Sequence, residues 1–224
     1  MKNRLLIPVL FLLSLMFTQA GDGPICVLFL GHNAKHHPSN EYYPMLAKAL
    51  GRDAIYFDYT TSVEEALGDA RYLGKFDVLL LYANHGTIAP HQWKNLKGFV
   101  ENGGGFVPVH CASWCFGNEP GFDQLVGDRF KSHQTGIFKA RIVDGKHAAM
   151  KNVKAFEAWD ETYFHNKHNT QNRTVLMVRD AVKGDPHTKP EPWTWVRTQG
   201  KGRVFYTASG HDARVWGHAG FHQL

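Results

Sequence analysis

The chain has 224 residues, which suits one medium-sized domain with a full hydrophobic core. Its hydrophobic content of 43% and charged content of 20% are ordinary for a soluble globular protein. The formal net charge is only +5, and no basic run interleaved with aromatic side chains occurs. These features exclude nucleic acid as an expected partner.

The first 20 residues have the pattern of a secretory signal peptide. Lys2 and Arg4 precede an apolar run over residues 5–17, and Thr18-Gln19-Ala20 is a plausible cleavage site. The run is shorter than the roughly 20 apolar residues of a spanning helix, so we favour a signal peptide over an uncleaved anchor. Cleavage would remove two of 25 basic and none of 20 acidic residues, leaving a charge of about +3. We therefore expect a secreted or periplasmic domain over residues 21–224, without stable membrane insertion after cleavage.

In chain order, the first half alternates between strand-like and helix-like segments. We expect strand 25–31, helix 41–50 capped by Ser39 or Asn40, strand 54–59, a short helix capped by Ser62, strand 76–82, helix 90–102 and strand 106–109. Glu65 follows Ser62 at the spacing of a capping box. This order predicts a parallel sheet covered by helices.

The second half is less regular. Residues 137–143 and 174–178 have strand patterns, and residues 192–197 and 203–207 flank Gly200-Lys201-Gly202 as an antiparallel hairpin. Residues 221–224 resemble the first turn of a helix. We therefore expect a domain that lacks its last helix or continues into further sequence.

Four histidines directly follow strand-like runs: His32, His85, His110 and His211. The carboxyl ends of strands in an open α/β sheet share one edge, where ligands bind. Four imidazoles gathered there would suit metal binding or proton transfer. The pattern thus predicts where the site lies more clearly than what it does.

The segment from Gly103 to Trp114 runs from a strand through small residues into a helical stretch, the shape of a nucleophile elbow. His110 or Cys111 would be exposed there. His110 fits a ligand, acid or base, whereas Cys111 as a nucleophile would need a nearby base and a lowered pKa. The alternative is that both residues only pack at the end of a strand and have no chemical role.

Cys111 and Cys115 can form a disulfide bond only if their Cα atoms lie within about 7 Å. We expect Cys26 to be a buried core residue.

Three further segments are candidates for the site. His36 and His37 are adjacent, so at most one of them faces a site. It is equally possible that both lie on an exposed loop. The carboxylates and phenol of residues 159–163 suit sugar binding or acid–base chemistry, with a helix cap or surface turn as the alternative. Asp212 can orient His211 or remain solvated. Five other histidines have no ligand-like spacing, and we expect most of them at the surface: His147, His165, His168, His187 and His222.

Taken together, these segments resemble the ThuA-like family, named for trehalose utilisation. The matching pieces are Gly31-His32 and the histidines after it, Gly103 to His110, Asp160 to Tyr163, Arg203 to Asp212 and Trp216 to Phe221. The resemblance runs in order from about residue 25 to the end. It implies a flavodoxin-like fold similar to class I glutamine amidotransferases, with a mostly parallel sheet, helices on both faces and an antiparallel extension. The Gly-x-Cys-x-Gly pattern of those enzymes is absent, so glutaminase activity is not expected.

The resemblance implies carbohydrate utilisation, on trehalose-like or oxidised glycosides. His110 and His211 correspond to the elbow and the late catalytic histidine of the related fold. We therefore predict His110, His211 and Glu161 as catalytic groups, with His110 and His211 as ligands if a divalent metal such as zinc is bound. The predicted substrate-binding residues are His32, His85, Trp114, Asp160, Tyr163 and Asp212.

Two other functions stay open. One is a non-catalytic carbohydrate-binding or accessory domain of a larger exported protein, and the other is a thiol enzyme that uses Cys111. For both the carbohydrate-active enzyme and the carbohydrate-binding domain, the expected partner is a small-molecule sugar. A homo-oligomer is also open.

Overall fold

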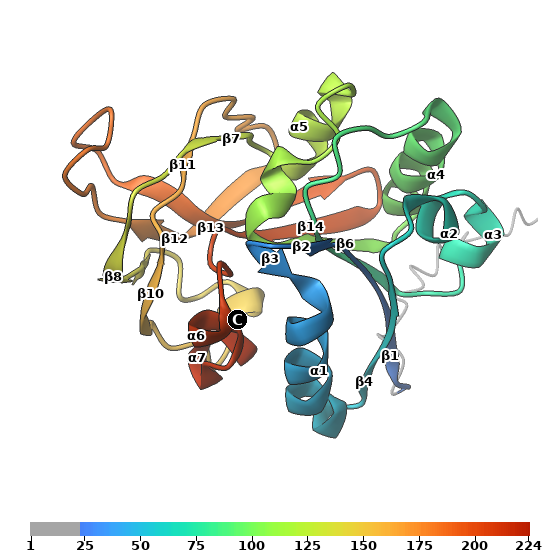
Figure 1. Ribbon diagram of the computed structural model, residues 1–224, viewed down its shortest axis with the longest axis horizontal. Helices are drawn as coiled ribbons and strands as arrows, with labels where there is room; N and C mark the ends of the chain where they lie inside the picture. The colour runs from blue at the N-terminus through green and yellow to red at the C-terminus, as the bar shows by residue number, and fades with distance from the viewer. Residues whose placement is uncertain (1–22) are drawn as a thin grey trace, which may run out of the picture.

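An eight-stranded sheet forms the centre of the computed structural model, which describes residues 23–224 (Figure 1). The predicted signal peptide over residues 1–20 lies outside the described residues. The strands lie in the following order: β4 (Ile55–Thr60), β1 (Ile25–Gly31), β5 (Val78–Tyr82), β6 (Gly105–Pro108), β14 (Gly202–Thr207), β13 (Glu191–Gln199), β12 (Arg173–Arg179) and β9 (Arg141–Ile142). From β4 to β14 neighbouring strands are parallel, and from β14 to β9 they are antiparallel. The predicted fold class is confirmed.

Helices cover both faces of the parallel part of the sheet (Figure 1). Successive residues of a strand point to opposite faces, so Leu28 and Leu30 of β1 join one core while Val27 and Phe29 join the other. The first core includes helices α2 (Val63–Leu67), α3 (Ala70–Leu73), α4 (Pro90–Glu101) and α5 (Pro120–Val126). The second includes α1 (Ser39–Leu50), α6 (Ala213–Trp216) and α7 (Ala219–His222). Burial on both faces explains why β1 and β5 are almost wholly apolar.

Three small antiparallel pairs lie outside the main sheet: β2 (Asn33–Ala34) with β3 (His37–Pro38), β7 (Phe130–Ser132) with β11 (Phe164–His165), and β8 (Thr135–Lys139) with β10 (Glu157–Glu161). Short 3-10 helices span Gly51–Asp53, His110–Trp114 and Ala148–Met150. Among residues 23–224, no helix combines the length and apolarity needed to cross a bilayer.

The predicted elements of the first half are confirmed, with ends shifted by a few residues. The side chain of Ser62 accepts the backbone N–H of Glu65 at 3.1 Å, as the capping pattern predicted. Helix α1 instead begins at Ser39 without a side-chain cap, so the predicted cap there was wrong. The strand predicted over residues 137–143 was also wrong in part, because it divides at Ala140. β8 pairs with β10, whereas β9 pairs with β12, so the two parts of the segment form separate strands in different sheets.

Candidate active site at the carboxyl edge of the sheet

His110 occupies a tight elbow directly after β6. Its φ of 49° lies in the left-handed region, which costs a non-glycine residue about 1–2 kcal/mol. Two hydrogen bonds hold the elbow: His110 Nδ1 lies 2.7 Å from the carbonyl oxygen of Ala208, and the Tyr206 hydroxyl donates to the His110 carbonyl at 3.1 Å. Because a carbonyl oxygen only accepts, Nδ1 of His110 carries the proton. The predicted turn after the strand is confirmed, and a 3-10 helix begins at His110. The predicted exposure was wrong, because the side chains of His110 and Cys111 are both buried.

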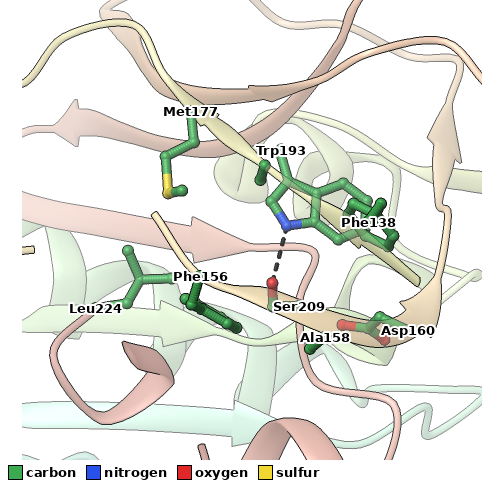
Figure 2. Close-up of a pocket in the computed structure, with 9 residues that line it drawn as sticks. Phe138, Phe156, Ala158, Asp160, Met177, Trp193, Ser209 and Leu224 are labelled. Carbon is green, nitrogen blue, oxygen red and sulfur yellow. Dashed lines mark hydrogen bonds between the residues drawn. The ribbon is translucent and has the colours of Figure 1, made fainter. Parts of the chain in front are cut away.

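The segment after β14 brings His211 beside this elbow. Gly210 has a φ of 140°, and a Cβ added there would lie 3.1 Å from His110 Cβ, so the close approach favours glycine. The carboxylate of Asp160 accepts the backbone N–H groups of Gly210 and His211 at 3.0 and 3.1 Å. Ser209 accepts a hydrogen bond from the Trp193 indole at 2.8 Å, beside Asp160 in Figure 2. Buried Asp160 therefore acts as an anchor for the loop that carries His211.

Glu161 points to the opposite side of β10 from Asp160, as adjacent strand residues do. Its Oε2 lies 3.2 Å from His110 Nε2, and its Oε1 lies 3.2 Å from His211 Nδ1. His133, exposed on the loop between β7 and β8, places Nε2 3.4 Å from the same Oε1. Burial alone would raise the pKa of Glu161, but His110 and His211 outweigh it and hold that pKa far below its usual range. Glu161 is thus an anion facing three imidazoles.

The same pairing raises the pKa of His211. Burial acts against its protonation, but the contact with Glu161 and the nearby carboxylates outweigh the effect of burial. The side chains of His211 and Glu161 keep 16% and 11% of their surface exposed, whereas that of His110 has none. Solvent therefore reaches this site from the side of His211 and Glu161.

His37 completes the cluster from the β2–β3 pair. The tight turn between these strands buries His37 and leaves His36 exposed. The ring of His37 lies 5.2 Å from that of His110 and 5.4 Å from that of His211, between centroids. Burial, helped by His110 and His211, lowers the pKa of His37 to about 2, so its imidazole is neutral. Ligand atoms of His37, His110, Glu161 and His211 all lie within 4.8 Å of one another.

His32 and His85 flank this cluster at the ends of β1 and β5. The ring of His32 lies 5.8 Å from that of His85 and 6.2 Å from that of His37. His85 Nε2 lies 3.1 Å from the carbonyl oxygen of Gly31. Burial and the neighbouring His85 lower the pKa of His32 to about 4, and burial also lowers the pKa of His85. The four strand-end histidines therefore lie along one edge, as the sequence predicted, with His37 between them.

The remaining predicted residues lie at different distances from the cluster. The ring of Tyr163 stacks on His110 with centroids 4.1 Å apart, and Phe130 lies between Tyr163 and Trp114. Trp114 is 48% exposed, under the guanidinium of Arg129. Asp212 caps α6 and pairs with Arg214. Tyr163 thus belongs to the centre, whereas Trp114 and Asp212 lie farther out.

A family model described as trehalose utilisation, ThuA, matches residues 26–224. This chain belongs to the ThuA family. No curated protein matches it. The resemblance inferred from the histidine segments and the elbow is confirmed over nearly the whole chain.

Solved structures share the ThuA fold. A ThuA-like protein of Bacteroides uniformis has a TM-score of 0.70 at 18% identity, covering 88% of this chain and 89% of that one. A ThuA-like protein of Parabacteroides merdae has a TM-score of 0.75 at 18% identity, covering 89% and 86%. The β-galactosidase of Rahnella sp. R3 is similar over 88% of this chain but only 30% of its own, at 15% identity and a TM-score of 0.56. At such identities, these likenesses show the fold alone.

The cysteines of this ThuA chain are poorly placed for thiol chemistry. Cys111 is buried within the apolar core beside α1, and burial raises the pKa of its thiol well above the usual value. Cys111 and Cys115 are both free, so they form no disulfide bond, and Cys26 is half-buried where a buried residue was expected. Because a protonated, enclosed thiol is a poor nucleophile, the structure argues against the thiol-enzyme alternative.

Sequence reasoning missed two residues near the centre of the ThuA site and misplaced another histidine. His37 was not separated from His36, and His133 was not singled out, because neither follows a long strand. Most of the five histidines that include His165 were expected at the surface, but His165 is fully buried between Glu191 and Tyr206. Its strand, β11, has only two residues, too few for a recognisable pattern.

Proposed function

We propose that this ThuA-family chain is an exported carbohydrate-active enzyme that acts on trehalose-like or oxidised glycosides. His110, His211 and Glu161 would supply the reactive groups. The observation that carries the proposal is the position of the Glu161 carboxylate, 3.2 Å from a nitrogen of each histidine. These three groups come from β10 and from the loops after β6 and β14, so the fold itself brings them together.

The chemistry of this centre suits a sugar oxygen. Imidazoles beside a carboxylate can transfer a proton to or from a hydroxyl or carbonyl group, or hold a metal ion that polarises it. Both modes need His110, His211 and Glu161 together. The family description, trehalose utilisation, supports a sugar as the substrate.

Turnover of sugars tests the proposal. The purified protein is incubated with trehalose, other disaccharides and oxidised glycosides, and consumption is followed by mass spectrometry. We expect at least one to be consumed, and His110→Gln and His211→Gln to lower the rate by about 100-fold or more. His36→Gln is the matched control, because His36 is exposed outside the cluster. Full activity in both site variants, with circular dichroism showing that they are folded, would contradict the assignment.

A non-catalytic sugar-binding domain is the second candidate, favoured by the exposed ring of Trp114. Such rings present apolar faces that suit sugar rings. Calorimetry distinguishes the two functions. Sugar binding that is unchanged in His110→Gln and His211→Gln, without any product, would replace the enzyme by the binding domain.

Export is a separate part of the proposal, supported by the charged and apolar pattern of residues 1–20. Expression of the full chain in a bacterial host, followed by fractionation and N-terminal sequencing, tests it. We expect a mature protein that begins at Gly21 in the periplasm or medium. An uncleaved chain in the cytoplasm or membrane would overturn it.

A further inference from the structure

We propose that His37, His110, Glu161 and His211 bind one divalent metal ion of the zinc type at the carboxyl edge of the sheet. This inference rests on the proposed function and deepens it, because it assigns how the same centre acts. It also gives a role to His37, which direct proton transfer by the other three residues does not need.

The geometry of the cluster is close to that of a metal shell. Each residue offers one ligand atom, and all four atoms lie within 4.8 Å of one another. Zinc bonds of about 2.0–2.1 Å in a tetrahedron place ligand atoms about 3.3 Å apart. Each Glu161 oxygen already has one such neighbour: Oε2 lies 3.2 Å from His110 Nε2, and Oε1 lies 3.2 Å from His211 Nδ1. The upper limit of 4.8 Å exceeds the tetrahedral spacing, so binding would draw the four ligand atoms closer together.

The histidine nitrogens that face the cluster are buried without partners. Among residues 23–224, no hydrogen-bond partner is present for His37 Nε2, His110 Nε2 or His211 Nδ1. The contacts of His110 and His211 with Glu161 are short but lack hydrogen-bond geometry. Buried polar atoms normally have partners, so three unpartnered nitrogens around one carboxylate are the arrangement expected where a cation binds.

The hydrogen bond behind His110 strengthens this argument. Its Nδ1 donates to the carbonyl oxygen of Ala208 at 2.7 Å, which leaves Nε2, 3.2 Å from Glu161 Oε2, as the ring nitrogen that can bind a metal. Metal-binding histidines characteristically donate their second N–H to a carbonyl or carboxylate, as His110 does.

The donor set also indicates the kind of metal. Three imidazole nitrogens and one carboxylate oxygen suit zinc or another first-row divalent ion better than calcium or magnesium. The overlapping set of His32, His37 and Cys111 is also close enough, but it contains no carboxylate, and Cys111 packs among apolar side chains. We therefore assign the metal to the set that contains Glu161.

Zinc titration of the full-length protein tests the assignment. Protein treated with a chelator and dialysed is titrated with zinc chloride by calorimetry, and with cobalt chloride by visible absorption. We expect one zinc per chain with sub-micromolar affinity, and a tetrahedral cobalt spectrum. His37→Gln should weaken zinc binding by about 100-fold or more, because loss of a ligand exceeds the 10–100-fold loss of an outer-shell partner. The neighbouring variant His36→Gln is the matched control and should bind zinc like the wild type.

Absence of zinc binding in the folded wild type, or equal binding by wild type and His37→Gln, would overturn the metal site. If His37→Gln does not fold, Glu161→Gln serves instead with the same expectation. Zinc binding without turnover of any sugar would overturn the proposed function alone. Turnover in a wild-type protein that binds no zinc would overturn the metal site alone.

Discussion

Two buried carboxylates of this chain, Asp128 and Glu161, have very different surroundings. Asp128 Oδ1 accepts the backbone N–H groups of Arg129 and Lys167, each at 3.0 Å. Its Oδ2 accepts a guanidinium N–H of Arg173 at 3.1 Å and contacts His168 Nδ1. Glu161 instead meets three histidines, and the buried nitrogens of His110 and His211 facing it have no hydrogen-bond partner within the described residues.

This difference separates a structural carboxylate from a reactive one. A charge whose lone pairs are all occupied fixes the parts of the chain that it joins, and it has no capacity left for a ligand. A charge that faces unpartnered imidazoles keeps that capacity. Burial and partial charge alone do not distinguish Asp128 from Glu161, whereas the geometry of their partners does.

The largest expected effect is on Glu161. Glu161→Gln keeps the shape of the side chain but removes its charge, so turnover should fall by about 10²–10⁴-fold, the range typical of acid–base groups. The free energy of unfolding should fall by less than in Asp128→Asn, because two of the three histidines that meet Glu161, His133 and His211, are partly exposed. Steady-state kinetics and urea denaturation measure the two quantities. Unchanged turnover would remove Glu161 from the reactive centre.

Asp128→Asn is the opposite case. It leaves Arg173, whose side chain is 5% exposed, without its anionic partner. Breaking a buried ion pair from one side costs about 3–5 kcal/mol, so we expect a loss of that size in the free energy of unfolding. Turnover per folded molecule should stay close to that of the wild type. A large loss of turnover in folded Asp128→Asn would erase the contrast between the two carboxylates.

The smallest expected effect is the pH dependence that His168 contributes. Its contact with Asp128 raises the pKa of His168 above 6.5, the usual value for a histidine. The protonated pair therefore stabilises the fold fully below about pH 6.5, and this contribution is lost as the pH rises through the raised pKa. Thermal denaturation should show that the melting temperature of His168→Gln falls less than that of the wild type between pH 6 and pH 9. Parallel curves for the two proteins would contradict the prediction, and His36→Gln is the control.

Asp128 contributes a pH dependence of stability on the acid side. The contact with His168 and the backbone N–H of Lys167 outweigh burial and lower the pKa of Asp128 below its usual value. The stability that this carboxylate contributes is therefore present above about pH 4 and is lost as the pH falls through the lowered pKa. In Asp128→Asn, acid denaturation between pH 4 and pH 2 should be less steep than in the wild type, as measured by circular dichroism.

Much of the site could be predicted from the sequence because it follows regular strands. His32, His85, His110 and His211 each end a recognisable apolar run, and parallel strands place their carboxyl ends at one edge. The elbow was predictable for the same reason. The mostly parallel sheet, the helices on both faces and the antiparallel extension were implied by the family resemblance.

The rest depends on contacts that no local pattern encodes. His37 is chosen over His36 by a pair of two-residue strands, too short to show a period. His133 reaches Glu161 because β8 pairs with β10, whose partner residues are 18–26 positions apart in the chain. The same pairing makes residues 157–161 a strand, whereas the sequence also allowed a helix cap or a turn. The separate roles of Asp160 and Glu161 follow from that strand.

The central claim is that the unpartnered nitrogens around Glu161 mark a metal centre, and anomalous X-ray diffraction tests it most directly. Crystals of the protein grown with zinc are measured on both sides of the zinc absorption edge. The account predicts one strong anomalous peak per chain, about 2.0–2.2 Å from the ligand atoms of His37, His110, Glu161 and His211. Crystals in which zinc occupies other positions while this cluster shows no peak would contradict it.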